Sequence, residues 1–244
     1  MIRSHLLTFA FTATLALLAA AMPSYADDAQ WGYTGASAPQ AWADLSADNA
    51  LCNAGLEQSP INLKNAEDVD LPPLNVEYKE GNADVLNNGR TIQVNAQGSG
   101  GVLIGEEDYN LLQFHFHTPS EHYVDARPYP MELHMLHRAE DGRFGMVAVF
   151  ITLGDDANPA INTLWSAAQT QAAITFSVQS LLPENLDYYK YQGSLATPPC
   201  SENIAWYILK TPITISQAQL NAFQAMFPLN ARPVQALNER VVRE

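Results

Sequence analysis

The chain has 244 residues, with 26 acidic side chains against 12 basic ones, and a formal net charge of −14 at pH 7. This acidic balance argues against nucleic acid and anionic membranes as partners. Hydrophobic residues make up 47% of the chain, enough for one substantial core, and nothing indicates a second domain.

The first 26 residues have the pattern of a secretory signal peptide. Arg3 precedes an apolar run over residues 6–21, and Ser24-Tyr25-Ala26 forms a small-x-small cleavage signal. The run is short and interrupted by threonine, which argues against a membrane span. We therefore expect a mature domain of residues 27–244 that is periplasmic or secreted and has no contact with the membrane after cleavage.

Residues 31–60 are rich in Ala, Ser, Asn and Pro and show no sustained period, so we expect an irregular segment wrapped on the body. Cys52 lies in this segment, and the other cysteine of the chain is Cys200. Two thiols in an exported protein most simply form one disulfide. The alternative, a pair of metal thiolates, lacks a nearby CxxC partner.

Strand-like segments then recur at short intervals. They cover residues 75–78, 84–86, 91–95, 101–104 and 110–117. Helical patterns are few: residues 158–170 begin with Asn-Pro in the style of an N-cap and first helical position, and residues 216–226 begin at a capping serine. Many strands with few short helices predict a mainly β (α+β) single domain with a largely antiparallel sheet.

Five of the six histidines lie within residues 111–138. Alternation at period two predicts a strand with two different faces. One face would carry Leu111, Gln113, His115 and His117, and the other Leu112, Phe114 and Phe116. The imidazoles of His115 and His117 would lie about 6 to 7 Å apart on one face, where both can bind one ion.

A second strand, residues 131–138, is predicted because Asp141-Gly142 and a Val/Ile/Phe-rich run follow it. On a strand His134 and His137 lie on opposite faces, whereas a helix would place them side by side. Only one of them can therefore join the first pair.

We choose His134, because Glu132 shares its face and can hold its second ring nitrogen, as Gln113 can for His115. Three neutral imidazoles and an open fourth position are typical of catalytic zinc. His122 and His137 are expected to be hydrogen-bonded core residues.

Residues 188–199 are the other unusual stretch. Gly193 and Thr197-Pro198-Pro199 predict a stiff loop, outside any strand, that presents a hydroxyl near Cys200. Such a loop can form the wall of a site, although alone it is more typical of an ordinary surface turn.

Together these motifs resemble the α-class carbonic anhydrases of the bacterial exported type. The motifs are WGY at 31–33, QSPI at 58–61, QFHFHTPSEH at 113–122, MELHMLH at 131–137, GSLATPPCSE at 193–202, and Trp206. The similarity runs from about residue 31 to residue 240. It implies a central twisted, mostly antiparallel sheet of about ten strands with a few short peripheral helices.

The resemblance also implies roles for individual residues. His115, His117 and His134 match the Zn²⁺ ligands, Gln113 and Glu132 their outer partners, and Cys52 with Cys200 the disulfide. The substrate-binding positions are Leu136, Val147, Leu195, Ala196, Thr197 and Trp206. Zinc lowers the pKa of its water to about 7, which yields hydroxide that attacks CO2 to form bicarbonate.

Two positions depart from the family pattern. Ala196 stands where the family has a threonine whose hydroxyl donates to a buried glutamate, matched here by Glu121. Losing such a hydrogen bond costs on the order of 1 to 3 kcal/mol, or roughly 5- to 150-fold in rate. Thr197 matches the second threonine of the loop and would compensate in part.

Arg90 stands at the position of the family's proton-shuttling histidine, after Asn87-Asn88-Gly89. Arginine does not release its proton near neutral pH. We therefore expect a slow hydratase that depends on buffer, and Arg90 is also placed to attract an anion at the cleft mouth.

Two alternatives compete with this interpretation. The spacing of His115, His117 and Glu121 is similar to that of cupins, but no histidine follows His137 to complete a cupin site. A metal-bearing binding protein that has lost turnover is the alternative from another class, and Ala196 and Arg90 favour it. CO2 and bicarbonate are the expected small-molecule partners, and a homodimer is compatible with the resemblance.

Overall fold

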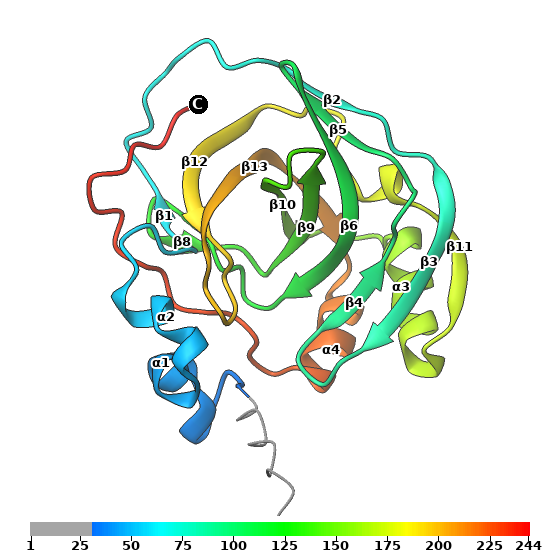
Figure 1. Ribbon diagram of the computed structural model, residues 1–244. Helices are drawn as coiled ribbons and strands as arrows, with labels where there is room; N and C mark the ends of the chain where they lie inside the picture. Colours follow the sequence, from blue (N-terminus) through cyan, green and yellow to red (C-terminus); the bar gives the residue numbers. More distant parts are fainter. Residues whose placement is uncertain (1–30) are drawn as a thin grey trace, which may run out of the picture.

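The computed structural model describes residues 31–244 (Figure 1). The predicted signal peptide, residues 1–26, lies outside the described residues. Between residues 31 and 244, every helix is too short or too polar to cross a membrane.

A large mixed sheet of ten strands forms the body of the protein, as predicted. Its strands are β2 (Leu74–Val76), β3 (Glu80–Asn87), β4 (Ile92–Asn95), β5 (Gly101–Ile104), β6 (Glu107–His117), β9 (Met131–Ala139), β10 (Phe144–Leu153), β11 (Ala173–Ser177), β12 (Tyr188–Ser194) and β13 (Glu202–Ile215). The order is β11-β3-β4-β6-β9-β10-β13-β12, with β5 on β6 and β2 on β5. All neighbours are antiparallel except β10 and β13. A small separate sheet contains β1 (Asn62–Leu63), β7 (Tyr123–Val124) and β8 (Arg127–Pro128).

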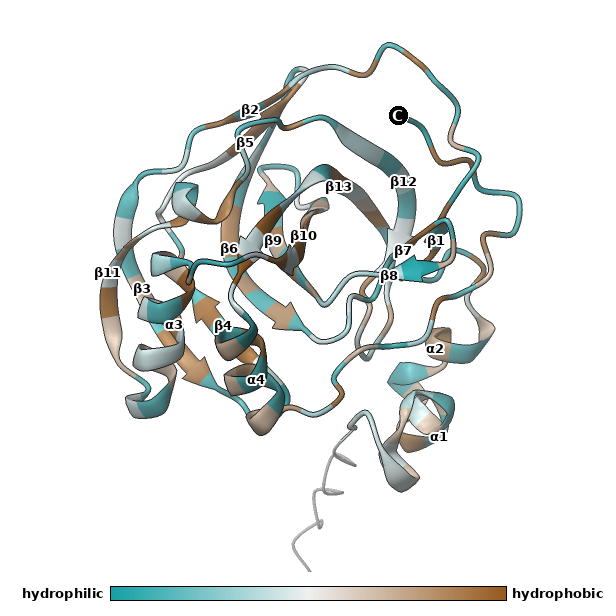
Figure 2. Cartoon of the chain, turned by 180° about the vertical axis from the view of Figure 1, so that it is seen from behind, coloured by the Kyte–Doolittle hydropathy of each residue, from teal (hydrophilic) through white to brown (hydrophobic). Residues whose placement is uncertain are grey.

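The helices are short and peripheral. They are η1 (Gly35–Ser37), η2 (Pro39–Ala41), α1 (Trp42–Leu45), η3 (Ala47–Asn49), α2 (Leu51–Ala54), α3 (Pro159–Thr170), η4 (Val178–Leu181) and α4 (Gln217–Met226). Asn158 caps α3 by accepting from two backbone N–H groups, and Ser216 forms a capping box with Gln219 at α4. Both predicted helices are confirmed, and their apolar sides pack near β3 and β4 (Figures 1 and 2).

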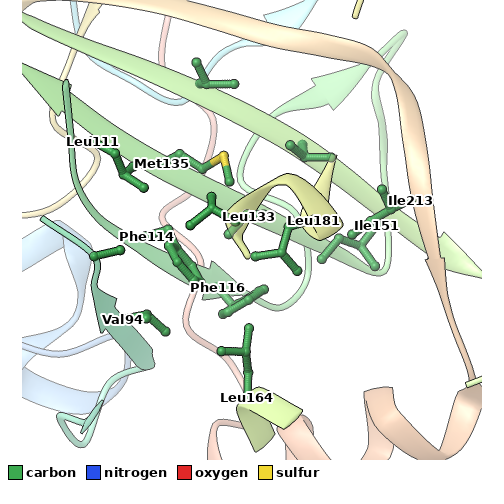
Figure 3. Close-up of a cluster of buried hydrophobic side chains, with 14 of the residues drawn as sticks. Val94, Leu111, Phe114, Phe116, Leu133, Met135, Ile151, Leu164, Leu181 and Ile213 are labelled. Atoms are coloured by element: carbon green, nitrogen blue, oxygen red, sulfur yellow. The ribbon is translucent and has the colours of Figure 1, made fainter. Parts of the chain in front are cut away.

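The central strands β6 and β9 separate two environments. On one face, Phe114, Phe116, Leu133 and Met135 pack with Leu164 of α3 and Leu181 of η4 in the main core (Figure 3). On the other face, the paired residues are His115 with His134 and His117 with Glu132. Alternation along two neighbouring strands thus divides the sheet into an apolar face and a histidine-bearing face.

The predicted alternation is wrong at Leu111 and Leu112. Leu111 pairs with His137 and Gln113 with Leu136, so Leu112 is an extra residue in β6 that forms a bulge. The bulge turns Leu111 to the core face with Phe114, while Gln113 stays on the face of His115. From Gln113 to His117 the predicted faces are observed.

A disulfide joins Cys52 of α2 to Cys200, with a Cα–Cα distance of 5.0 Å across 148 residues of sequence. The prediction of one disulfide is confirmed. The bond fixes the loop after β12 to the N-terminal helices, where Trp31, Tyr33 and Trp42 pack edge to face. The region predicted as irregular therefore consists of short helical turns held to the body.

Candidate metal centre

Three imidazoles converge on the polar face of β6 and β9. His115 lies directly opposite His134, and His117 follows two residues along on the same face. The ring centroid of His117 lies 4.9 Å from that of His115 and 4.5 Å from that of His134. One nitrogen from each ring lies within 4.8 Å of the other two. This spacing allows all three residues to bind one ion.

The outer nitrogens of the first two rings are held by hydrogen bonds. His115 Nδ1 donates to Gln113 Oε1 at 2.9 Å, and His117 Nδ1 donates to the backbone carbonyl of Asn230 at 2.7 Å. These bonds fix each tautomer, so the Nε2 atoms carry the free lone pairs. The Nε2 of His117 is buried and has no partner within the described residues. An unpartnered buried nitrogen of this kind fits a metal ligand.

His134 is held from its opposite nitrogen. Its Nε2 lies 3.0 Å from Glu132 Oε1, although the contact lacks the alignment of a good hydrogen bond. Its Nδ1 is then the atom available to an ion. Glu132 is fully buried, and His122 Nδ1 donates to its Oε1 at 2.7 Å. Burial raises the pKa of Glu132, but His122 and His134 outweigh it and hold that pKa well below its usual value.

The series of buried hydrogen bonds continues beyond His122. Its Nε2 accepts from the hydroxyl of Tyr191 at 2.7 Å, and Tyr191 is bonded in turn to Ser59 at 2.7 Å. His137 has no part in this series, because it lies on the core face and forms hydrogen bonds with Tyr78 and the Met135 carbonyl. Both histidines are thus hydrogen-bonded buried residues, as expected.

Burial keeps the three converging imidazoles neutral. It is the main reason that the pKa of His115 falls to about 3, with a further contribution from His134. Burial and the neighbouring imidazoles likewise lower the pKa of His117 well below its ordinary value. Burial also lowers the pKa of His134, against the opposing effect of Glu132. Neutral rings at neutral pH have the lone pairs that a metal ion requires.

Glu121 lies close to His117 and His134 and has an incompletely satisfied carboxylate. Its Oε1 accepts from the backbone N–H of Arg232 at 2.7 Å. Its Oε2 has no partner within the described residues and lies 3.7 Å from His134 Nδ1. Burial raises the pKa of Glu121 well above its ordinary value.

A profile of the eukaryotic-type carbonic anhydrase family matches residues 37–244. The chain belongs to this family. A carbonic anhydrase from Pectobacterium atrosepticum is 38% identical over 95% of this chain and 98% of its own length. One from a Nostoc species is 41% identical over 91% of this chain and 88% of its own length. The α-carbonic anhydrase of Thermovibrio ammonificans, solved in complex with the inhibitor sulfanilamide, has a TM-score of 0.83 and 39% identity, covering 88% of this chain and 99% of its own. The chain is therefore a carbonic anhydrase, and the family activity is the hydration of CO2 to bicarbonate.

An apolar wall adjoins the histidines of this carbonic anhydrase. Leu136 of β9 pairs with Met146 of β10, which pairs with Trp206 of β13. Leu195 packs into the same cluster, and the ring of Trp206 lies 4.9 Å from that of His134. The structure therefore brings together three of the predicted wall residues, Leu136, Leu195 and Trp206.

Val147 is not among them, contrary to the sequence prediction. It pairs with Met135, its side chain is 1% exposed, and it belongs to the main core on the opposite face. Successive side chains of a strand point to opposite faces. A shift of one residue along β10 therefore moves a side chain from the face of the apolar wall to the face of the main core. Met146 occupies the wall position instead.

The loop after β12 holds the remaining predicted residues. Ala196 is buried and its side chain has no polar atom, while Thr197 is half-buried. The Thr197 carbonyl accepts from the N–H of Cys200 at 2.9 Å, which closes the turn beside the disulfide. Gly193 lies in β12, so the prediction of a loop outside any strand is wrong at Gly193, and the loop begins only after Ser194.

Arg90 lies in the turn between β3 and β4. Its guanidinium stacks over Trp31, with the central carbon 4.2 Å from the ring centroid. Tyr33 packs edge to face against the same Trp31 ring, with the ring centroids 5.6 Å apart. Burial first, and then the charge of Glu121, raises the pKa of Tyr33, whereas the charges of Arg90 and Arg232 lower it.

Sequence reasoning missed several residues that complete the site. Asn230 and Arg232 come from the segment after α4, and each is nearly fully buried. Their contacts with His117 and Glu121 span more than a hundred residues of sequence. No local pattern marks them, because the sequence around a polar residue in a loop has no apolar periodicity that would predict its burial.

Proposed function

We propose that Zn²⁺ binds at His115, His117 and His134 and that the enzyme uses it to hydrate CO2. The observation that carries this proposal is the set of three buried imidazoles, each with one nitrogen next to an outer polar group and the other free. An all-nitrogen set with an open position is typical of catalytic zinc. Bound zinc would supply the Lewis acidity that makes water a nucleophile at neutral pH.

Residues of this chain would then bind and orient the reactants. Gln113, the Asn230 carbonyl and Glu132 hold the imidazoles in place, and loss of such outer partners typically costs roughly 10- to 100-fold in metal affinity. Leu136, Met146 and Trp206 offer an apolar surface that suits CO2 and excludes water.

Ala196 and Arg90 are proposed to slow this enzyme. The unpartnered Oε2 of Glu121 supports the first part, because a threonine hydroxyl at position 196 is what the family pattern would offer to that glutamate. Thr197 is the residue proposed to compensate in part. Arg90 cannot accept a proton, so proton release would depend on buffer.

The same unpartnered carboxylate oxygen favours a second candidate, a metal-bearing binding protein with little turnover. The two candidates differ in one measurable property, the zinc-dependent rate of CO2 hydration.

We also propose that the protein acts outside the cytoplasm, as a periplasmic or secreted domain of residues 27–244. The disulfide between Cys52 and Cys200 supports this location, because such bonds persist in oxidising compartments.

Stopped-flow CO2 hydration tests the proposal. The rate is measured on protein of known zinc content, before and after chelation, with imidazole buffer varied over a wide range. Ala196→Thr and Arg90→His are measured beside it. We expect zinc-dependent turnover that rises with buffer and is increased by both substitutions. A rate equal to that of the chelated sample at every buffer concentration would exclude the enzyme and favour the binding protein.

A further inference from the structure

A pocket of about 390 Å³ lies at the meeting point of three segments, and one of its lining residues, Asn230, accepts a hydrogen bond from His117. These are the first described residues, the turn between β3 and β4, and the segment after α4, which lie together on one side of the molecule (Figure 1). Trp31, Tyr33, Asn88, Arg90, Phe227 and Asn230 are among the residues that line it. The pocket thus combines aromatic surface with one cationic group.

Arg90 is positively charged and has no ionic partner in the part of the chain that the structure describes. The ion pairs of Arg143 and Lys210 are at 2.8 Å or less, but no carboxylate of residues 31–244 comes within such a distance of Arg90. Among the same residues, the side chain of Arg90 makes one long hydrogen bond, 3.5 Å, to the Trp31 carbonyl, and its buried Nε has no partner. In a chain of net charge −14, an arginine kept free of carboxylates is open to an external anion.

The surrounding turn holds this arginine in place. Asn88 Oδ1 accepts from the backbone N–H groups of Arg90 and Thr91, each at 3.0 Å. Asn230 Nδ2 donates to the Arg90 carbonyl at 2.9 Å, while the Asn230 carbonyl accepts from His117. Stacking on Trp31 restricts the guanidinium further. One residue, Asn230, therefore connects the backbone of Arg90 to a ring of the proposed metal centre.

We propose that Arg90, held in place by Trp31 and Asn88, binds a small oxyanion in this pocket, and that an anionic buffer base held there accepts the proton released by CO2 hydration. The guanidinium fork matches two oxygens of one anion. In the case of hydrogen phosphate, the dianion takes up the proton and leaves as dihydrogen phosphate. This inference rests on the proposed hydration activity for its second half only, because anion binding itself requires no turnover.

Binding is tested by titrating inorganic phosphate into the zinc-loaded protein at constant ionic strength, with the backbone amide NMR signals of Asn88 and Gly89 as reporters. A separate titration uses bicarbonate, which shares the oxyanion chemistry but is the product of the reaction. The variants are Arg90→Gln, which removes the charge, and Arg90→Lys, which retains the charge without the fork. Arg138→Gln is the matched control, because Arg138 also faces an aromatic ring, Phe144, but lies exposed on β9.

We expect phosphate to bind the unmodified protein and the Arg138→Gln control with equal affinity. Its affinity for Arg90→Gln should be lower by about tenfold or more. Arg90→Lys should lie between them. Equal phosphate binding by the unmodified protein and Arg90→Gln would overturn the anion site, whatever the activity. Binding of bicarbonate alone would overturn the role of a buffer base and mark a product site instead.

The proton-accepting role is tested by the hydration rate in phosphate and in imidazole at matched concentration of base. Phosphate should accelerate the unmodified enzyme more than imidazole does, and Arg90→Gln should lose that advantage while keeping its response to imidazole. Equal acceleration by the two buffers would overturn the role. Phosphate binding that depends on Arg90 without hydration in any buffer would support the anion site and contradict the proposed function instead.

Discussion

The two faces of β6 and β9 show how one pair of strands can build two opposite environments. On the core face, Phe114, Phe116 and Leu133 are fully buried among other apolar side chains. On the histidine face, His117 and His134 are buried just as deeply, yet the Nε2 atom of each has no hydrogen-bond partner among residues 31–244. Burial of polar groups without partners costs stability, and a bound metal ion would offset part of that cost. The core face thus supplies packing energy, and the histidine face keeps free nitrogen atoms that can bind a metal ion.

The largest expected effect comes from removing a ring of the histidine face. His117→Ala takes away the imidazole whose Nε2 is unpartnered. We expect zinc affinity to fall by more than the roughly 100-fold that loss of an outer partner costs, and CO2 hydration to fall to the buffer rate. Zinc content by mass spectrometry and stopped-flow rates provide the measurement. His137→Gln is the matched control on the core face and should keep its zinc. Equal loss of zinc in both variants would contradict the assignment of metal binding to the histidine face alone.

Leu133→Ala tests the opposite face. Leu133 is fully buried next to His134 in sequence but points into the core. We expect unfolding free energy to fall by about 2 to 5 kcal/mol, because the substitution leaves a cavity. Zinc content should stay at the level of the unmodified protein under native conditions. Denaturant unfolding and zinc analysis measure the two effects, and loss of zinc without loss of stability would contradict the assignment.

Ala196→Thr tests whether a hydroxyl at position 196 can supply the missing partner of the Glu121 carboxylate. A hydroxyl that reaches the unpartnered Oε2 should raise the hydration rate by roughly 5- to 150-fold, the equivalent of about 1 to 3 kcal/mol. Ala196→Val adds a side chain of similar shape without the hydroxyl and should give no such gain. Thermal unfolding of the metal-free variants offers a second measurement, in which the threonine variant should be the more stable of the two. Equal rates and equal stability would show that the hydroxyl has no role here.

A smaller effect is expected from the one histidine on the core face. Burial lowers the pKa of His137 to about 4, from an ordinary value of 6.5. Between these pH values the unfolded chain binds a proton that the folded protein does not, so stability falls as the pH drops from 6.5 toward 4. The loss assigned to this group is about 3 kcal/mol at most. His137→Gln should reduce the pH slope of the unfolding free energy by up to one proton; an unchanged slope would mean that His137 does not titrate this way.

Much of the fold could be predicted from local patterns. The strand β5 has the predicted bounds, residues 101–104, and both larger helices begin at the predicted caps. The long strand β13 was not predicted, because β10 and β12 flank it and Ile204 to Leu209 are buried on both faces. Such a strand shows a continuous apolar run in place of alternation.

The candidate site could be predicted only in its local part. His115, His117 and His134 share a face because the period of a strand is fixed, and that period held from Gln113 onward. The bulge at Leu112 and the placement of Met146 instead of Val147 depend on register, which the sequence of one strand does not specify. Asn230 and Arg232 reach the site through the tertiary fold, which no local pattern describes.

The most direct test of the account is an anomalous diffraction map recorded at the zinc absorption edge from crystals of the protein. We expect one strong peak between the imidazoles of His115, His117 and His134, next to Nε2 of the first two and Nδ1 of the third. A strong peak elsewhere, or no peak in crystals grown from protein with one zinc per chain, would contradict the central claim that the histidine face of the sheet is the metal centre.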